Sequence, residues 1–383
     1  MHQLGKKVNL IVCQKSKIDD WIEHFTKFYF DYFVYDLTKK KDFGIFFEQC
    51  QLGTECIVGV INYELAFRRK QLQQLGDFTL MLDESSLIQN EKAKRTKFIL
   101  SMDVENVILL SGTPTGGKYE KLWSQIHLLG WNISKTLYWK QYVEYHIDDR
   151  QGFPITIVDG YKNVDRLKSK MREYGCVFMK TEDVIDLPEQ VHQTIKVNTT
   201  KEYRKFRKDC IVLVYGVELV GDTTLTKMLY ERQLCGVYNK DKLNAFRELL
   251  ESTEDRLIVF YNFIAEVDGM KRIASDCDRP VSIVCGHDKD LRNYDKCDDS
   301  ITFIQYQAGA MGLNLQKANK IVYFTPPLSS ELFEQSKKRI HRVGQERSCF
   351  YYYLTCKGSI EERIYKTLEM RKDYTEALFE MEE

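Results

Sequence analysis

Short apolar runs that alternate with helical patterns are the feature that most constrains how this chain of 383 residues can fold. Such runs are typical of strands that are buried on both faces of a parallel sheet. Parallel strands need long crossover connections, which are usually helices. In the first half the runs are residues 8–13, 56–61, 78–82 and 106–110. In the second half they are residues 257–261, 281–285, 302–305, 320–324 and 350–354. The sequence therefore predicts an α/β protein with two lobes.

The same pattern divides the chain into three parts. Residues 1–130 are the predicted first lobe, which closes with a helix that ends near Gly130. Over residues 131–200 the alternation breaks down among aromatic residues, glycines and prolines, which predicts an insertion and a linker. Residues 201–383 are the predicted second lobe, in which helical patterns over 201–250 precede the strands.

The charge balance excludes a general electrostatic attraction to nucleic acid. Lys and Arg together number 56, as do Asp and Glu, so the formal net charge is zero. Any attraction to DNA must therefore be local, and a basic cluster by itself is more often a solvated surface. The candidate clusters are residues 68–70, 92–97, 201–208 and 337–339.

Cysteine usage and targeting patterns predict the compartment. The 11 cysteines lack paired metal-ligand spacing, and no signal-peptide pattern follows Met1. No apolar run reaches the roughly 18 residues that a membrane span needs. We therefore expect a soluble chain with reduced thiols, in the cytoplasm and without a membrane partner.

Two adjacent carboxylates follow the apolar run 78–82, and they are Asp83 and Glu84. Ligands of parallel sheets bind at the carboxyl ends of the strands. Adjacent carboxylates in that position suit hydrolysis of a magnesium nucleotide. The alternative is that both residues only cap a helix that begins near Ser85, since carboxylates favour helix amino termini.

Two arginines, Arg339 and Arg342, are three positions apart within residues 335–345. On a helix this spacing places both guanidinium groups on one face, where they can clamp phosphoryl oxygens while charge moves to the leaving group. Arginines with this role are arginine fingers. The alternative is a solvated basic face that also includes Lys337 and Lys338.

Taken in order, these segments resemble the motifs of helicase superfamily 2 ATPases, and within them the Swi/Snf-like DNA translocases. The resemblance covers residues 83–86 as the second motif, 109–114 as the third, 256–261 as the fourth, 308–315 as the fifth and 335–345 as the sixth. Residues 8–16 and 58–64 are similar to the family's DNA-facing segments. Motifs ordered over roughly 260 residues are far more specific than any one of them. Small phage and bacterial members look most similar.

The resemblance implies that ATP and Mg²⁺ bind between two RecA-like lobes. Asp83 would hold the magnesium ion, Glu84 would polarise the attacking water, and both arginines would reach the nucleotide from the second lobe. The further nucleotide contacts that it implies are Gly312, Gln335 and Gln345. The implied contacts to the DNA backbone, or coupling residues, are Lys15, Ser16, Asn62, Tyr63, Thr113 and Asn314. The implied partner is duplex DNA, read with little sequence information.

The chain lacks the phosphate-binding loop of the type G-x-x-x-x-G-K-[ST] with which members of this family open. Only thirteen residues precede Gln14, so we expect the first lobe to be incomplete at its N-terminus. A near match at residues 112–119 has Tyr119 where Ser or Thr would bind magnesium, and a phenol cannot replace that hydroxyl. Two departures from the family pattern are Ser86, in place of histidine, and Thr325-Pro326-Pro327.

Three hypotheses follow. The first is a fragment or split subunit of a DNA-dependent ATPase, with the loop supplied from upstream or by another polypeptide. The second is a DNA-binding or regulatory module that does not hydrolyse ATP, since nucleotide affinity falls steeply without the loop amides and lysine. The third is an unrelated interaction protein with fortuitous motifs. A phage-encoded chain would act in the cytoplasm of a bacterial host.

Overall fold

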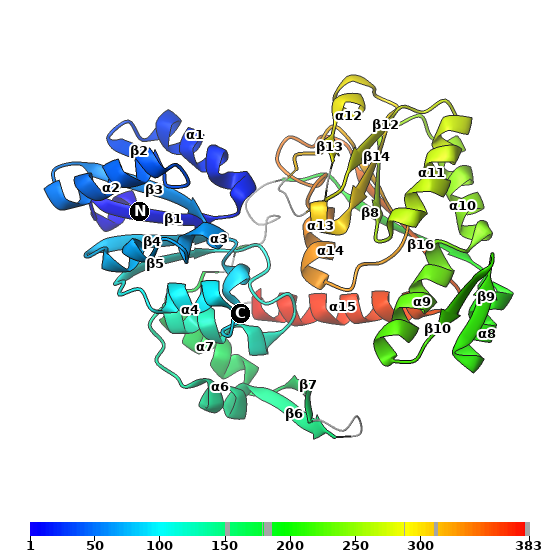
Figure 1. The fold of residues 1–383 in the computed structure, drawn as a ribbon, viewed down its shortest axis with the longest axis horizontal. Helices are drawn as coiled ribbons and strands as arrows, with labels where there is room; N and C mark the ends of the chain where they lie inside the picture. Colours follow the sequence, from blue (N-terminus) through cyan, green and yellow to red (C-terminus); the bar gives the residue numbers. More distant parts are fainter. Residues whose placement is uncertain (150–153, 178, 180–185, 287, 310–312, 380–383) are drawn as a thin grey trace. The chain divides into compact units, whose positions relative to one another are not determined.

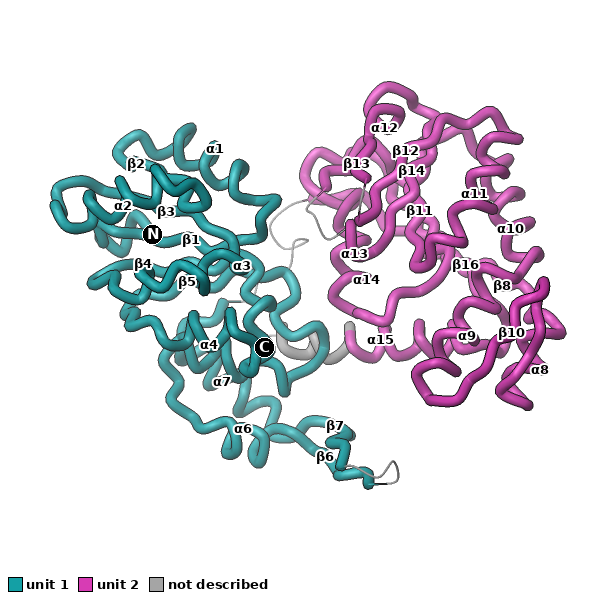
Figure 2. Tube along the Cα trace, in the orientation of Figure 1, with its two compact units in different colours: residues 1–178, 374–383 teal, residues 179–373 magenta. Residues whose placement is uncertain are grey.

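The computed structural model describes residues 1–149, 154–177, 179, 186–286, 288–309 and 313–379. The chain divides into two compact units, residues 1–178 with 374–383 and residues 179–373, which Figure 2 shows in different colours. Each unit contains its own sheet of mainly parallel strands, with helices beside it (Figure 1). The predicted α/β class, with parallel sheets flanked by helices, is confirmed. Among the described residues, no helix is long and apolar enough to cross a membrane.

The sheet of the first unit has five parallel strands in the order β2-β3-β1-β4-β5. They are β1 (Val8–Cys13), β2 (Tyr32–Asp36), β3 (Cys56–Asn62), β4 (Phe78–Asp83) and β5 (Asn106–Leu110). Four of them match the predicted apolar runs. The edge strand β2 is not among the predictions, because its central residues are exposed or only half-buried. Val8 pairs with Ile57 and with Phe78, so β1, β3 and β4 run in register toward one edge.

Both faces of this sheet are buried, as the continuous apolar runs predict. On β1, Leu10 and Val12 belong to one core cluster, whereas Ile11 and Cys13 belong to another. The α-helices around the sheet are α1 (Ile18–Phe28), α2 (Lys40–Leu52), α3 (Tyr63–Ala66), α4 (Lys94–Leu100) and α5 (Trp123–Leu128). Short 3₁₀ helices are η1 (His2–Leu4), η2 (Lys15–Lys17), η3 (Lys70–Gln74), η4 (Ser85–Ile88) and η5 (Tyr119–Lys121).

The described residues between 131 and 177 belong to the first unit, which differs from the expected insertion and linker. They form α6 (Lys135–Tyr142), the antiparallel hairpin β6 (Val143–Asp148) with β7 (Ile155–Tyr161), and α7 (Val164–Glu173). Trp131 and Tyr138 share a core with Leu122 and Ile126 from the end of the expected first lobe. Gly160 thus lies within a strand of the hairpin, and the aromatic residues fill a small core.

The sheet of the second unit has seven strands in the order β13-β12-β14-β11-β15-β16-β8, and only β13 is antiparallel to its neighbour. They are β8 (Gln190–Val197), β11 (Leu257–Tyr261), β12 (Val281–Val284), β13 (Lys289–Asp290), β14 (Ile301–Gln305), β15 (Lys320–Tyr323) and β16 (Cys349–Cys356). The five predicted runs are all strands here. The edge strand β8 lies within the expected linker. Its apolar residues are separated by polar ones, so it contains no continuous apolar run that would predict a strand.

The helical patterns predicted over residues 201–250 are interrupted by a hairpin, which corrects the expectation. Strand β9 (Ile211–Val214) pairs antiparallel with β10 (Val217–Val220). The two turn residues between them, Tyr215 and Gly216, have φ values of 47° and 82°, as two-residue hairpin turns require. The α-helices of this unit are α8 (Lys201–Asp209), α9 (Thr224–Gly236), α10 (Lys240–Glu251), α11 (Ile264–Asp276), α12 (Arg292–Lys296), α13 (Tyr306–Gly309), α14 (Ser330–Lys337) and the part of α15 (Ile360–Phe379) up to Asp373.

Candidate functional site

The carboxyl ends of the central strands in the first unit bring together residues that the sequence analysis selected. Cys13 pairs with Asn62 across β1 and β3, and Asp83 pairs with Leu110 across β4 and β5. Glu84 has φ 53° and ψ 57°, a left-handed conformation that is uncommon outside glycine. Its side chain makes no capping hydrogen bond to η4. The backbone therefore turns sharply at the pair of carboxylates, and the capping alternative has no support here.

Asp83 is held at two points by side chains from elsewhere in the unit. The indole N–H of Trp21, on α1, donates to Asp83 Oδ2 at 3.0 Å. The hydroxyl of Tyr63 donates to the Asp83 carbonyl oxygen at 2.9 Å. Tyr63 is 1% exposed, and its burial raises the pKa of the phenol well above its usual value. Tyr63 is therefore a buried support of the Asp83 backbone, and Trp21 is a contact that the sequence analysis missed.

The segment after Glu84 is linked to the expected third motif. Ser85 donates from Oγ to Gln125 Oε1 at 3.0 Å, and Gln125 Nε2 donates to the carbonyl of Pro114 at 2.7 Å. Gln89 Nε2 reaches the same carbonyl at 3.1 Å. Thr113 is 5% exposed, and among the described residues no partner accepts or donates a hydrogen bond at its hydroxyl. A glutamine bridge thus joins the second and third motifs, and only the three-dimensional packing shows it.

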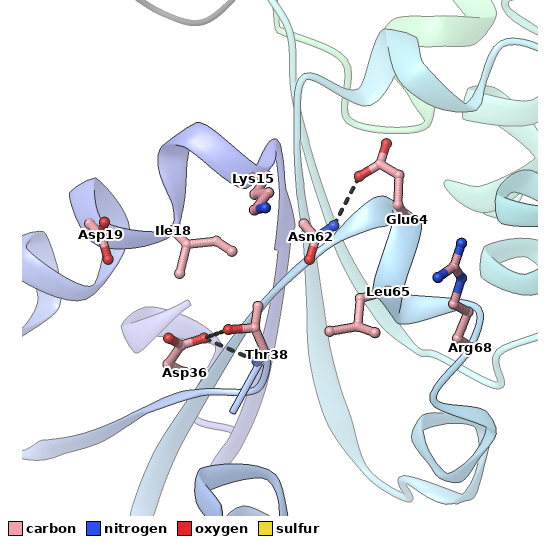
Figure 3. Close-up of a pocket in the computed structure, with 9 residues that line it drawn as sticks. All are labelled: Lys15, Ile18, Asp19, Asp36, Thr38, Asn62, Glu64, Leu65 and Arg68. Atoms are coloured by element: carbon pink, nitrogen blue, oxygen red, sulfur yellow. Dashed lines mark hydrogen bonds between the residues drawn. The ribbon is translucent and has the colours of Figure 1, made fainter. Parts of the chain in front are cut away.

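A cavity of about 510 Å³ lies at the carboxyl ends of β1, β2 and β3. Figure 3 shows its lining side chains, which are Lys15, Ile18, Asp19, Asp36, Thr38, Asn62, Glu64, Leu65 and Arg68. Asn62 Nδ2 donates to Glu64 Oε2 at 3.0 Å. Burial opposes ionisation of Asp36, but hydrogen bonds from Thr38 and the nearby ammonium of Lys39 together outweigh it and lower the pKa of that carboxyl. The structure therefore brings Lys15 and Asn62 to one cavity, whereas Ser16 is exposed on η2 outside its lining.

The prediction that Arg339 and Arg342 lie one turn apart on one helix is wrong. Helix α14 ends at Lys337, and both arginines lie in the turns that follow. The amide of Arg339 bonds the Ser336 carbonyl at 3.2 Å, a tighter spacing than the α-helical one. The chain then reverses near Gly344, whose φ is 91°. The spacing of three positions between the two arginines could not reveal that the helix ends before either of them.

The arginine turns are tied to the loop after α13. Arg342 Nη1 donates to Asn314 Oδ1, and the Leu315 amide donates to the Arg339 carbonyl at 3.2 Å. Gln335 lies half-buried on α14, and Gly312 lies outside the described residues.

Gln345 is buried, and its amide is engaged with backbone groups. Its Nε2 donates to the carbonyls of Gln316, Ala318 and Ile340 at 3.1, 2.9 and 3.2 Å. Its Oε1 accepts from the Arg347 amide at 3.1 Å. These contacts hold the arginine turns against the loop after α13, so they favour a positioning role for Gln345 over direct contact with a nucleotide.

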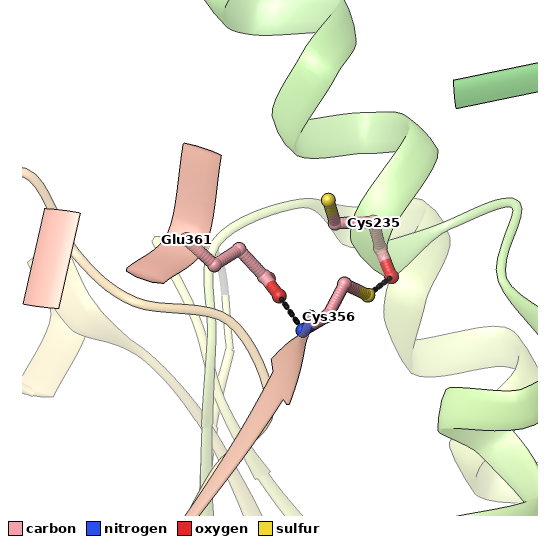
Figure 4. Close-up of side chains that lie close together, drawn as sticks. All are labelled: Cys235, Cys356 and Glu361. Atoms are coloured by element: carbon pink, nitrogen blue, oxygen red, sulfur yellow. Dashed lines mark hydrogen bonds between the residues drawn. The ribbon is translucent and has the colours of Figure 1, made fainter. Parts of the chain in front are cut away.

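A second cluster with metal-ligating side chains lies inside the second unit. Figure 4 shows Cys235, Cys356 and Glu361, whose ligand atoms lie within 4.8 Å of one another. The carboxylate of Glu361 already accepts from Lys242 Nζ at 2.5 Å and from the Cys356 amide at 3.0 Å. Lys242 and Glu361 are both fully buried. The positive charge of the Lys242 side chain would repel a metal cation in this position. The cluster is therefore a buried ion pair with two thiols beside it.

Comparison with known proteins assigns the chain to a family. The model of the SNF2-related domain matches residues 2–245, and that of the helicase conserved C-terminal domain matches residues 241–344. The chain therefore belongs to the SNF2-related family. The predicted resemblance to Swi/Snf-like ATPases of helicase superfamily 2 is confirmed at this level.

Relatives with this likeness include a mouse SWI/SNF-related matrix-associated actin-dependent regulator of chromatin, subfamily A member 1, which is 21% identical over 95% of this chain and 38% of its own length. The putative ATP-dependent helicase/translocase YwqA of Bacillus subtilis is 23% identical over 98% of this chain and 44% of its own. The chicken DNA repair and recombination protein RAD54-like is 21% identical over 85% of this chain and 52% of its own length. The chain thus spans about half or less of these relatives.

A solved structure with some likeness is the Sulfolobus solfataricus SWI2/SNF2 ATPase core in complex with dsDNA. It is 19% identical, with a TM-score of 0.42, over 98% of this chain and 83% of that structure.

Proposed function

We propose that this chain is a fragment or split subunit of a DNA-dependent ATPase that translocates on duplex DNA. The observation that carries the proposal is the position of Asp83 and Glu84 at the carboxyl end of β4, in a chain of the SNF2-related family. Ligands of parallel sheets bind at that edge. The same edge carries the cavity in which Lys15, Arg68 and the Asn62 amide would contact phosphates, beside the carboxylates of Asp19, Asp36 and Glu64.

Asp83 and Glu84 fit the tasks of metal ligand and water-polarising group. Trp21 occupies only Oδ2 of Asp83, and a carboxylate oxygen is the ligand that Mg²⁺ prefers. A bound Mg²⁺ would neutralise charge on the phosphates. Glu84 directly follows the metal ligand, and its left-handed backbone ends the extended course of β4. This conformation supports separate tasks for the two carboxylates.

The second unit would supply Arg339 and Arg342 to the transferring phosphate. Their fixed guanidinium forks suit phosphoryl oxygens wherever the backbone holds them, so the role does not require a shared helix face. The contact between Arg342 and Asn314 supports a link between the sixth and fifth motifs. In this proposal Gln335 and Gly312 contact the nucleotide, and Gln345 positions the arginine turns.

Lys15, Ser16 and Asn62 would contact the DNA backbone from the first unit, with Arg68 as a further cation in the same cavity. Contacts of this type position a protein on DNA without reading its sequence. Thr113 would couple these contacts to the nucleotide, which the glutamine bridge through Gln125 supports.

The phosphate loop that the chain lacks would be supplied by an additional segment paired to β5. Among the described residues β5 pairs only with β4, and its apolar residues remain half-buried, with Leu110 39% exposed. An apolar edge strand is a ready template for another strand. A loop that follows a strand beside β5 would lie two strand positions from Asp83 on β4, or about 10 Å at the usual strand spacing. A strand added at the opposite edge, beside β2, would lie four strand positions from β4, or about 19 Å at the usual strand spacing.

A module that binds DNA without hydrolysing ATP is the second candidate. The absence of a G-x-x-x-x-G-K-[ST] sequence in the chain favours it. This candidate predicts salt-dependent binding of duplex DNA that ATP does not change. A change of DNA affinity on addition of ATP would contradict it.

The test is ATP turnover by the chain mixed with a segment that carries a strand and a phosphate loop. We expect phosphate release from the mixture, and loss of at least about 100-fold in Glu84→Gln, since a water-polarising carboxylate contributes on this scale. Nucleotide binding should remain in that variant. Glu48→Gln, an exposed substitution on α2, is the matched control. Turnover that survives in Glu84→Gln would contradict the role of Glu84.

A further inference from the structure

We infer that Trp21 and Tyr63 are positioning residues that transmit DNA contact at the cavity to the carboxylate of Asp83. The inference rests on the proposed function, because it takes the cavity as the DNA site and Asp83 as the metal ligand. None of Trp21, Tyr63 and Asp83 belongs to the cavity lining. Both side chains reach the same residue from two different elements, at its side chain and at its backbone.

Trp21 connects the end of β1 to the Asp83 side chain. Lys15 begins η2, and α1 follows from Ile18 without a break. Trp21 is therefore on the first turn of a helix whose first two residues, Ile18 and Asp19, line the cavity together with Lys15. Its ring is half-buried against the core cluster that contains Ile18 and Phe25. Because a packed helix moves as a rigid element, a displacement of η2 would move the indole N–H that holds Asp83 Oδ2.

Tyr63 connects the end of β3 to the Asp83 backbone. It directly follows Asn62, a cavity residue, and is the first residue of α3. Its hydroxyl lies 2.9 Å from the Asp83 carbonyl oxygen and 3.5 Å from that of Glu84. The Glu84 backbone is in the left-handed region, which persists only where surroundings hold it. The Tyr63 hydroxyl is such a support, at the point where the two carboxylates diverge.

The two contacts differ in what they control. The indole hydrogen bond restricts rotation of the Asp83 carboxylate, so it determines which oxygen remains for a metal ion. The phenol hydrogen bond fixes the backbone from which both carboxylates project. A bound DNA that shifts Lys15 or Asn62 would thus alter the orientation of the Asp83 carboxylate. It would also alter the position of the backbone from which that carboxylate projects. Coupling between two sites in proteins is typically about 5- to 150-fold in affinity, and by linkage it is reciprocal.

The test uses the indole N–H resonances of the chain in a ¹H–¹⁵N spectrum, which needs no ATP turnover. The chain has four tryptophans, and Trp21→Phe identifies the resonance of Trp21. Trp123, whose indole N–H donates to the Ile133 carbonyl at 2.8 Å, serves as an internal control. Binding of duplex DNA is measured in parallel by fluorescence anisotropy of labelled DNA. Circular dichroism checks that each variant is folded.

We expect saturating duplex DNA to shift the Trp21 resonance and to leave that of Trp123 in place. The DNA-induced shift should be lost in Asp83→Ala, which removes the acceptor, and reduced in Lys15→Ala in proportion to lost DNA binding. In the form that turns over ATP, Tyr63→Phe should lower the stimulation by DNA about fivefold or more, with little change in DNA affinity.

Two contrary results are distinguishable. If DNA binds by anisotropy and the Trp21 resonance does not move, the inference is overturned while the proposed function stands. If DNA does not bind, the DNA part of the proposed function fails, and the inference fails with it. A Trp21 shift that persists in Asp83→Ala would also overturn the inference, because the movement would then not pass through the hydrogen bond.

Discussion

Glu266, at the start of α11, illustrates how single buried groups in this chain depend on their surroundings. Its Oε2 accepts hydrogen bonds from the amides of Asn262 and Phe263 at 3.0 and 3.1 Å, and from the Thr325 hydroxyl at 3.1 Å. Burial nevertheless raises the pKa of this carboxyl from 4.5 to about 7, against the effect of those hydrogen bonds. The desolvation of the charged form is therefore the larger effect.

This pKa predicts how the stability of the second unit depends on pH. Between pH 4.5 and about 7 the folded state keeps a proton that the unfolded state has lost, so stability falls as pH rises through this window. The full change is on the order of 3 kcal/mol. Glu266→Gln should flatten the dependence, and the exposed control Glu248→Gln should not. Amide hydrogen exchange of β11 and β14 from pH 5 to 8 measures it. An equal slope in wild type and Glu266→Gln would refute the assignment.

The ion pair of Lys242 and Glu361 gives a second prediction for single residues. Both side chains are fully buried, and Lys242 Nζ lies 2.5 Å from Glu361 Oε1. Lys242→Met leaves the carboxylate buried without its ammonium partner, which typically costs about 3–5 kcal/mol of stability. The double variant Lys242→Met/Glu361→Leu should recover most of that loss, since it buries no unpaired charge. Hydrogen exchange of β16 provides the comparison. A double variant less stable than Lys242→Met would contradict this account.

Among the elements, most strands that the sequence predicts are buried, and the half-buried edge strand β5 is predicted because its residues are nearly all apolar. Runs such as Leu257–Tyr261, with every residue buried, leave a continuous apolar signal. Strands β2 and β8 are partly exposed edge strands, so their sequences lack it. The end of α14 is likewise fixed by tertiary contacts, because the Gln345 side chain fastens the arginine turns to backbone carbonyls distant in sequence. The bridge through Gln125 has no signal in the sequence for the same reason.

The hairpin of β9 and β10 supports a prediction at the scale of an element. Gly216 has φ 82° with no atom within 4 Å of an added Cβ, so only backbone strain opposes a side chain there. Gly216→Ala should therefore destabilise the hairpin by about 1 kcal/mol. Gly286, in the same unit, also has open space but no such φ, so Gly286→Ala should be near neutral. Hydrogen exchange of β9 compares the two. Equal effects would mean that the turn tolerates a side chain.

At the scale of the whole molecule, the two units divide the residues of the proposed reaction between them. The carboxylates and the cavity with Lys15 lie in the first unit, and the arginine turns lie in the second. The order of motifs along the sequence predicted this division, because that order can be read without knowing the backbone geometry at each motif. The backbone conformation of single residues could not be predicted from the sequence. Examples are the left-handed Glu84 and the non-helical Arg339 and Arg342.

The central claim is that DNA controls ATP turnover by residues of both units. The most direct measurement is the rate of phosphate release by the chain with its phosphate-loop segment, with and without duplex DNA. Wild type should be stimulated by DNA. Lys15→Ala should need more DNA for the same rate, and Arg342→Ala should lose at least about 1000-fold of the rate, the scale on which an arginine finger acts. Turnover that DNA does not change, or that remains intact in Arg342→Ala, would contradict the account.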